Sequence, residues 1–203
     1  MEEKYKYMQN DKDIVLAAVQ QNGEVLKYVS EELKNDKDFI LEAVSQDGYA
    51  LKYASKELQN DKEIVLAAVK QSGLALQFAS KEMRSYKEVV MAAVQREGYA
   101  LNFASDKLRN DKDIVMPAVS QKGRALEYAS KEMQNDKEIV LAAVFQDGRA
   151  LQYASDKLRN DKEVVMAAVQ KDGSALEHVS EELQNDKDLL KNNKKDYDED
   201  LER

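Results

Sequence analysis

Apolar side chains recur along the chain with the spacing of an α-helix, interrupted at regular intervals by polar residues and glycine. In the stretch from Asn60 to Gly73 the apolar residues are Ile64, Val65, Leu66, Ala68 and Val69. At about 100° per residue these positions share one arc of a helix, which predicts an amphipathic segment, helix A, of about eleven residues. The opposite face of helix A holds Glu63, Ala67 and Lys70.

Residues at both ends of helix A indicate where the helix begins and where it ends. Asn60 followed by Glu63 resembles a capping box, in which each side chain meets a free backbone N–H of the other residue. Gly73 is expected to end the helix as the left-handed residue after its C-cap. The next apolar positions again have helical spacing and predict a short helix B over Leu74–Ala79. A serine-capped single turn over Ser80–Met83, with its last residue buried, completes the unit.

One period of 25 residues relates these segments along the chain. All seven glycines follow it, at Gly23, Gly48, Gly73, Gly98, Gly123, Gly148 and Gly173. Columns of serine, lysine and leucine repeat at the same step. A fixed period of this length is typical of a solenoid, because each short helical unit buries its apolar face only by stacking on its neighbours. We predict an all-α, right-handed α-solenoid of 25-residue repeats, each with helix A, short helix B and a one-turn segment.

The repeats divide the chain into three parts. Residues 10–184 hold seven tandem repeats, residues 1–9 are expected to form a degenerate N-terminal cap, and residues 185–203 a truncated eighth repeat with a charged C-terminal tail. Near-identical repeats leave a stacking surface at a poorly capped end. We therefore expect a monomer or weak end-to-end self-association.

Composition narrows the classes of function. The 203 residues include no cysteine and a single histidine, His178, which argues against disulfides, thiolate metal sites, a cysteine nucleophile and most histidine chemistry. The net charge of -8 and the pI near 4.9 argue against broad binding of phosphate backbones. No apolar run approaches the roughly 20 residues that span a bilayer, and the N-terminus lacks a secretory signal pattern. We expect a soluble cytoplasmic protein, located in a host cell if it serves as a viral or bacterial effector.

One unit of the repeat resembles a known family. The unit reads Asn-Asp-Lys-Glu-Ile-Val-Leu-Ala-Ala-Val, a Gln-x-Gly turn and Ala-Leu-x-Tyr-Ala-Ser-x-Glu-Leu, as seen in residues 60–83 and 135–158. It resembles the repeat of the domain of unknown function family number 4116. The resemblance implies tandem short helical repeats, found in protists, large DNA viruses and intracellular bacteria, and implies no activity. Departures from the pattern occur in three repeats, at Ser85-Tyr86 in place of Asn-Asp, at Pro117 in place of alanine, and at His178 in place of an aromatic residue.

Two polar patterns could carry chemistry. The lysine column, flanked by acids as in Asp61-Lys62-Glu63, is either a ladder of cations for a phosphate-bearing polymer or a set of ion pairs between repeats, and the negative net charge favours ion pairs. Paired acids such as Asp11 and Asp13 lack the spacing and glycine turn of a calcium loop, so we interpret them as helix caps. The chain contains no phosphate-binding glycine loop or serine nucleophile elbow. We predict no enzymatic activity, catalytic residue, cofactor or metal.

Positions at which the residue differs from one repeat to the next are the candidates for binding. They comprise the outward face of helix A, a row of acids at its start and the residue after each glycine. The selected residues are Tyr49, Leu74, Tyr99, Phe145, Glu42, Glu63, Glu88, Asp113 and Glu138. An acidic surface with aromatic anchors suits a protein or peptide partner that carries basic residues. The competing interpretation is that the acids only cap helices and that Phe145 has no role.

These observations predict a non-enzymatic protein-interaction scaffold with a mostly acidic binding surface, in which helix A lines one continuous face. Two alternatives remain open. The array is a non-catalytic arm of a larger enzyme or effector assembly, or it binds nucleic acid through the lysine column, with strong salt dependence. Neither nucleic acid nor a membrane is the expected partner.

Overall fold

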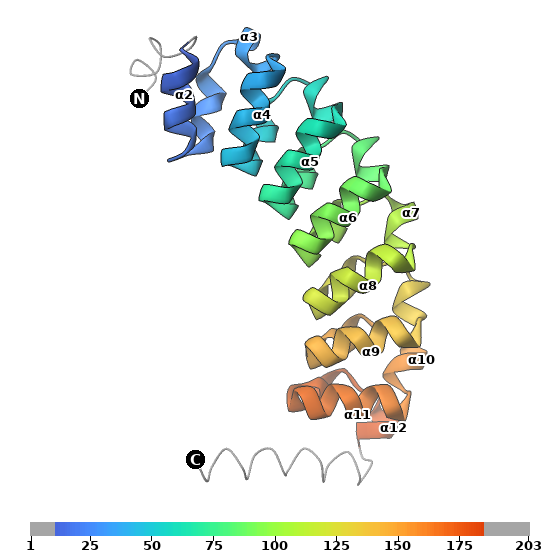
Figure 1. Ribbon diagram of the computed structural model, residues 1–203. Coiled ribbons are helices and arrows are strands. Elements are labelled where there is room, and N and C mark those ends of the chain that lie inside the picture. The colour runs from blue at the N-terminus through green and yellow to red at the C-terminus, as the bar shows by residue number, and fades with distance from the viewer. Residues whose placement is uncertain (1–10, 185–203) are drawn as a thin grey trace, which may run out of the picture. The chain divides into compact units, whose positions relative to one another are not determined.

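The computed structural model describes residues 11–184, which form helices joined by short turns, with no strand in that range. Two compact units divide the chain after Ser105, so that the described residues 11–105 lie in the first and 106–184 in the second. Within each unit the 25-residue period of the sequence returns as a three-part helical repeat (Figure 1). The predicted all-helical repeat architecture is confirmed. The predicted N-terminal cap and the truncated eighth repeat lie outside the described residues.

Helix A is an α-helix in every described repeat. Its copies are α2 (Lys12–Val19), α4 (Lys37–Gln46), α5 (Lys62–Gln71) and α6 (Lys87–Arg96) in the first unit, and α8 (Lys112–Gln121), α9 (Lys137–Gln146) and α11 (Lys162–Lys171) in the second. Helix α8 keeps the same ten-residue length as its neighbours although it contains Pro117. Within each unit, successive copies pack side by side and form one layer (Figure 1).

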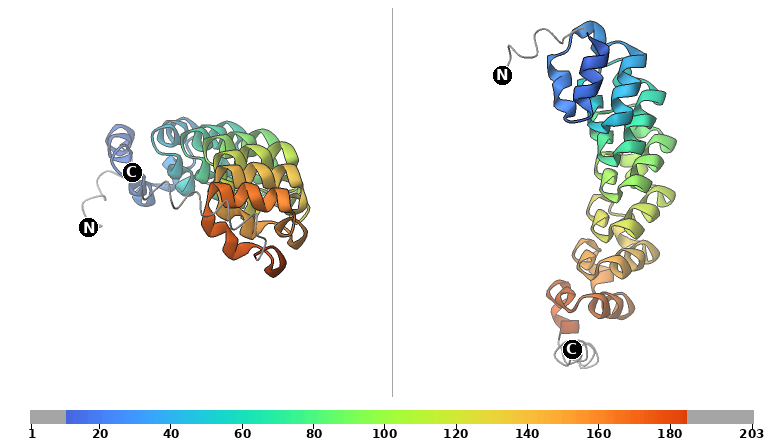
Figure 2. Two further views of the ribbon diagram at one scale, coloured as in Figure 1. Left: turned by 90° about the horizontal axis from the view of Figure 1, so that it is seen from below. Right: turned by 60° about the vertical axis from the view of Figure 1, so that its left-hand side comes forward.

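The predicted helix B is a 3₁₀-helix of six residues that begins at the glycine itself, and these short helices form a second layer in each unit (Figure 2). Its copies are η1 (Gly23–Tyr28), η2 (Gly48–Tyr53), η4 (Gly73–Phe78), η6 (Gly98–Phe103), η7 (Gly123–Tyr128), η9 (Gly148–Tyr153) and η10 (Gly173–His178). The tighter turn follows from the length, because a helix of only six residues closes few bonds between residues four apart. At the end of η4, the Ala79 N–H donates to the Leu76 carbonyl 3.2 Å away, three residues earlier.

A single helical turn links each repeat to the next. The copies are α3 (Glu31–Lys34), η3 (Leu58–Asn60), η5 (Met83–Ser85), α7 (Asp106–Arg109), η8 (Met133–Asn135), α10 (Asp156–Arg159) and α12 (Glu181–Gln184). The predicted serine cap is confirmed: the Met83 N–H donates to Ser80 Oγ at 3.1 Å, and Met83 is buried.

The core of each repeat lies where helix A packs against the 3₁₀ layer. Helix α5 contacts both η2 and η4. The fully buried side chains of this repeat are Ile64, Val65, Ala68, Val69, Ala75 and Leu76. Leu66 was expected in the same arc but is only half-buried. A helix covered on one side buries a stripe narrower than the apolar arc of its sequence.

The repeat glycine does not have the left-handed conformation predicted from its place after helix A. None of the glycines among residues 11–184 has a positive φ. A Cβ atom on Gly73 would instead lie 2.5 Å from the carbonyl oxygen of Ala93 and 2.9 Å from Cβ of Glu97, both in the following repeat. Glycine is therefore needed for close approach between repeats, a tertiary requirement that a local helix-ending rule does not contain.

The N-cap of helix A is the aspartate, one residue after the predicted asparagine. Asp61 Oδ1 accepts hydrogen bonds from the N–H groups of Glu63 (2.9 Å) and Ile64 (3.2 Å). Asn60 instead binds the turn at the end of its repeat: Ser80 Oγ donates to its Oδ1, and its Nδ2 donates to Glu82 Oε2 at 3.1 Å. The predicted capping box is therefore wrong, because the asparagine side chain binds residues far along the chain instead of the backbone of α5.

Candidate interaction surfaces

Within each unit, a ladder of ion pairs joins the start of one helix A to the start of the next. Lys37 Nζ lies 2.8 Å from Asp61 Oδ2 and 2.9 Å from Glu63 Oε2 of the following repeat. The same double pairing recurs in the second unit, from Lys112 to Asp136 and Glu138, and from Lys137 to Asp161 and Glu163. The interpretation of the lysine column as ion pairs between repeats is confirmed at these positions.

The ion pairs of this ladder shift the pKa values of carboxylates that take part in them. The hydrogen bonds from Lys37 and Lys137 hold the pKa values of Asp61 and Asp161 below the ordinary value of 3.8. Because the folded-state pKa is the lower one, the stabilising contribution is present above the unfolded value and is lost as the pH falls through the folded value. These carboxylates therefore contribute to stability at neutral pH and not in acid.

We expect the thermal unfolding midpoint to change little between about pH 7 and 5 and to fall below about pH 4. Replacing Asp61 by asparagine removes one titrating group and should flatten this fall, while asparagine can still cap α5. Glu57→Gln, which removes an exposed carboxylate that forms no ion pair within residues 11–184, is the control. An equal slope in wild type and Asp61→Asn, measured by circular dichroism from pH 7 to 3, would contradict this assignment.

The acidic row is the outer half of this ladder. Glu63, Glu88 and Glu138 are exposed, and each pairs with a lysine of the preceding repeat. Asp113 occupies the same place in α8 and is exposed as well. Where a lysine contacts two carboxylates, one negative charge remains in excess. The row is therefore mildly acidic, and its lysines are already engaged.

The residue after each glycine lies in the 3₁₀ layer and contacts its neighbours there. The Tyr49 ring meets the Phe78 ring edge-on, with centroids 5.9 Å apart. In the second unit, Arg124 Nε lies 2.8 Å from Asp147 Oδ2, and Arg149 Nε lies 2.9 Å from Asp172 Oδ2. Leu74 and Tyr99 are half-buried at this same position. The residues selected from the sequence are thus divided between the two layers.

Helix A presents a hollow in the first unit that the sequence did not reveal. Half-buried Leu41, Leu66 and Ala67 line it, together with the charged residues Lys62, Glu63, Lys70 and Glu88. Its volume is about 580 Å³, and its lining comes from α4, α5 and α6. Leu66 was assigned to the core, so the apolar lining was missed. The available signal was that four other apolar positions in α5 already suffice for one buried stripe.

Two selected residues stand out on helix A. Phe145 in α9 is 63% exposed, at a position where other repeats have glutamine, serine or lysine. Glu42 in α4 is exposed, at a position otherwise filled by alanine or proline. In each unit, we define the helix A surface as the part of the helix A layer that faces away from the 3₁₀ helices. Both residues belong to it.

The departure Ser85-Tyr86 has two structural consequences. Tyr86 replaces the capping aspartate, and α6 begins with no side-chain cap. Ser85 replaces the asparagine that in other repeats accepts the hydroxyl of the serine twenty residues later, and Ser105 Oγ is buried with no hydrogen-bond partner. The corresponding hydroxyl of Ser155 donates to Asn135 at 2.6 Å. Tyr86 is 43% exposed, and Lys62 Nζ lies 4.7 Å from its ring centroid.

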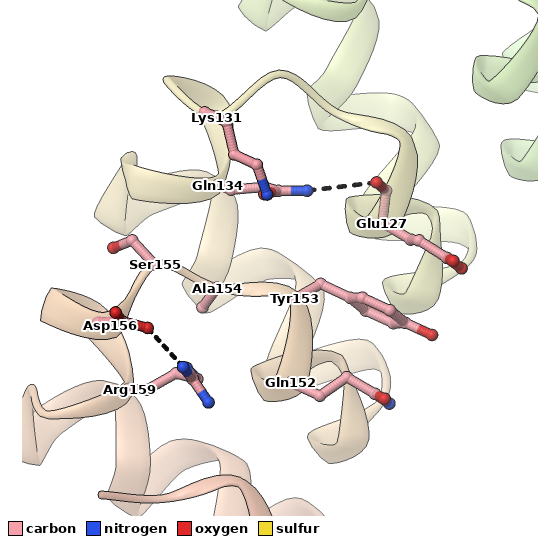
Figure 3. Close-up of a pocket in the computed structure, with 9 residues that line it drawn as sticks. All are labelled: Glu127, Lys131, Gln134, Gln152, Tyr153, Ala154, Ser155, Asp156 and Arg159. Atoms are coloured by element: carbon pink, nitrogen blue, oxygen red, sulfur yellow. Dashed lines mark hydrogen bonds and ion pairs between the residues drawn. The ribbon is translucent and has the colours of Figure 1, made fainter.

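A polar hollow of about 530 Å³ lies in the second unit (Figure 3). Its lining residues are Glu127, Lys131, Gln134, Gln152, Tyr153, Ala154, Ser155, Asp156 and Arg159. Buried Gln134 donates to the carbonyl oxygens of Leu126 (3.0 Å) and Glu127 (3.2 Å), which closes the end of η7. Arg159 pairs with Asp156. Burial and the nearby Glu127 carboxylate raise the pKa of Tyr153. Gln134 also accepts a hydrogen bond from Lys131 Nζ at 2.9 Å, so several of the polar groups bind one another, as expected of a structural network, whereas Arg159 Nε is buried without a hydrogen-bond partner.

Residues 11–184 contain neither a candidate metal site nor a candidate membrane-spanning helix. No cluster of histidine, cysteine, aspartate or glutamate there could hold a metal ion. His178 is half-buried in η10. No described helix has the length and apolar character needed to cross a membrane.

A comparison with protein families gives repeated matches along the chain. The model described as "Domain of unknown function (DUF4116)" matches residues 11–59, 36–84, 86–134, 136–184 and 161–193. The first four matches each span two successive 25-residue repeats. No curated protein and no solved structure matches the chain.

Proposed function

The chain belongs to the domain of unknown function family DUF4116, and from its geometry we propose that it is a non-enzymatic scaffold. In this proposal it binds a protein or peptide through the helix A surface. The observation that carries this proposal is a contrast between columns of the repeat. Inward columns, such as those of Ala68 and Val69, hold one residue type in all seven repeats and are buried from the second repeat onward, whereas the outward columns of Ala67 and Lys70 differ between repeats. A constant core under a variable surface is the arrangement by which repeat proteins build binding faces.

The outward side chains have the chemistry of an interface. Phe145 is an isolated large apolar side chain in solvent, and aromatic residues of this kind act as anchors when a partner covers them. At the starts of α5, α9 and α11 two carboxylates face one lysine, and this excess of acid favours a partner with basic residues. The lysines Lys37, Lys112 and Lys137 each contact two carboxylates, so nucleic-acid binding through this column is the less supported alternative.

Replacing Phe145 by glutamine tests the proposal. Glutamine occupies the same column at Gln20, Gln95 and Gln170, so the fold should be unaffected. We expect partner recovery in a pull-down from the native lysate, read by quantitative mass spectrometry, to fall at least about tenfold, as for an interface anchor. Gln170→Ala is the control. A partner recovered equally with wild type, Phe145→Gln and a Tyr99/Phe145 double-alanine variant would contradict binding through this surface. An enzyme recovered in fixed stoichiometry would favour the alternative of a non-catalytic arm.

Two finer features belong to the same proposal. We infer that the repeats wind with a right-handed sense, and an experimental structure with left-handed winding would contradict this. We also infer a cytoplasmic location, which cell fractionation tests.

A further inference from the structure

We propose that the hollow between α4, α5 and α6, together with the adjacent Tyr86, binds a peptide segment in which an apolar side chain lies next to a basic one. This inference rests on the proposed function and deepens it, because it assigns a place in the first unit and the chemistry of the bound segment.

The repeat that begins at Ser85 lacks two stabilising interactions that other repeats have. Tyr86 leaves α6 without the aspartate cap that α5 has from Asp61. Ser85 leaves the Ser105 hydroxyl buried and unpartnered, where Asn60 accepts the equivalent hydroxyl of Ser80. Local rules of stability are broken preferentially where a side chain serves a function. The two adjacent departures therefore point to a role for the side chain that gains exposure, which is Tyr86.

The Tyr86 ring is held in place by a cation. Lys62 Nζ lies 4.7 Å from its ring centroid and also 2.6 Å from Glu88 Oε2. A cation over one side of the ring restrains the side chain while it remains 43% exposed. A restrained, exposed tyrosine presents a large apolar contact area at a low entropic cost, which is why tyrosine is enriched among residues that dominate binding.

An apolar recess lies beside Lys62, the residue that contacts the Tyr86 ring. Leu41, Leu66 and Ala67 are half-buried and line a hollow of about 580 Å³. Lys62 and Glu88 belong to the same lining, so the tyrosine is joined to the recess through Lys62. A leucine, methionine or phenylalanine side chain from a partner would bury this apolar lining and displace water from it.

The charge near the hollow favours a basic residue next to the apolar residue of the bound segment. At the start of α5, the carboxylates of Asp61 and Glu63 share the single ammonium group of Lys37, which leaves one negative charge in excess there, while Lys62 and Glu88 pair one-to-one. An arginine or lysine of the partner would offset that charge and stack on the exposed tyrosine ring. Lys70 lies about 12 Å farther along α5 and forms no ion pair within residues 11–184. It disfavours a second basic residue there and so gives the bound segment a direction.

The test uses a displayed library of random peptides, selected on the full chain and followed by fluorescence anisotropy with the enriched peptides. We expect enriched peptides to pair an arginine or lysine with an adjacent leucine, methionine or phenylalanine. Their affinity should fall at least tenfold for Tyr86→Asp and for Leu66→Gln, and should be unchanged for Ser85→Asn. Tyr86→Asp supplies the cap that other repeats have, so its loss of binding cannot be attributed to unfolding.

Enriched peptides that bind Tyr86→Asp as tightly as wild type, or that lack a basic residue, would overturn the inference. If such peptides lose affinity for Phe145→Gln, the proposed function stands and only this site is wrong. Failure of the library to yield any peptide that depends on Tyr86, Leu66 or Phe145 would count against both.

Discussion

Replacing Gly73 by alanine is expected to lower the free energy of unfolding by about 1–3 kcal/mol, the range for forcing an extra carbon into a packed site. The new Cβ would lie 2.5 Å from the Ala93 carbonyl oxygen, a backbone atom of α6 that moves only if two repeats separate. The sign of this change in stability distinguishes a crowded glycine site from an open one. Where space is free and φ is negative, glycine to alanine stabilises a protein by about 0.4–1 kcal/mol, because it restricts the unfolded chain.

The measurement is urea unfolding at neutral pH, with the half-buried neighbour Ser72→Ala as the control. Ser72 makes no side-chain cap bond in η4, so its replacement should change stability by no more than about 0.5 kcal/mol. Gly48→Ala should behave as Gly73→Ala does, since its Cβ would lie 2.5 Å from the Ala68 carbonyl oxygen. Stabilisation by either glycine substitution would contradict the close approach between repeats.

The double substitution Ser85→Asn/Tyr86→Asp is expected to raise the free energy of unfolding by about 2 kcal/mol, the sum of two restored interactions. The aspartate introduced by Tyr86→Asp would cap α6 as Asp61 caps α5, which contributes about 1 kcal/mol. The asparagine introduced by Ser85→Asn would accept the orphaned hydroxyl of Ser105, as Asn60 accepts that of Ser80, and would contribute about 1 kcal/mol more. Adjacent substitutions need not add, so both single variants are measured beside the double one.

Thermal unfolding at fixed ionic strength reports the effect directly. The matched control is Lys81→Ala, an exposed residue near the end of the preceding repeat. A lower midpoint for Tyr86→Asp would mean that the contact between Lys62 and the Tyr86 ring stabilises the fold more than a helix cap does. In that case the tyrosine would need no functional explanation.

The architecture was predictable because the pattern of helix A is local and repeated. Ile64, Val65, Ala68 and Val69 form a stripe at helical spacing, and the same stripe is buried in the structure. The serine cap before Met83 was also local, since it joins residues three apart. Features that depend on sequence neighbours were therefore recovered from the sequence.

Features that depend on residues far along the chain or in the neighbouring repeat were not recovered. Asn60 and Asp61 are both good caps, and the choice between them follows from a bond to Ser80, twenty residues later. The role of Gly73 depends on Ala93 in the next helix A. Likewise, the sequence marked Ser85-Tyr86 as a departure, but its consequence for Ser105 is visible only when the repeats are stacked.

The placement of the candidate residues in the two layers was predicted only in part, for the same reason. Phe145, Glu42 and the acidic row lie on helix A as expected, whereas Tyr49 and Leu74 belong to the 3₁₀ layer and contact its side chains or lie half-buried there. Outward variation in a sequence identifies positions that are free of the core. It does not tell which of the two layers a position faces, because that depends on how the short second helix packs.

Hydroxyl-radical footprinting of the chain, alone and with its captured partner, tests the proposed binding surface most directly. The method reads solvent exposure of individual side chains, and the two layers offer distinct reporters. We expect Tyr86, Leu66 and Phe145 on helix A to become protected by the partner, while Tyr49 and Tyr153 in the 3₁₀ layer keep their reactivity. Protection confined to the 3₁₀ layer, with Tyr86 and Phe145 unchanged, would contradict binding through the helix A surface.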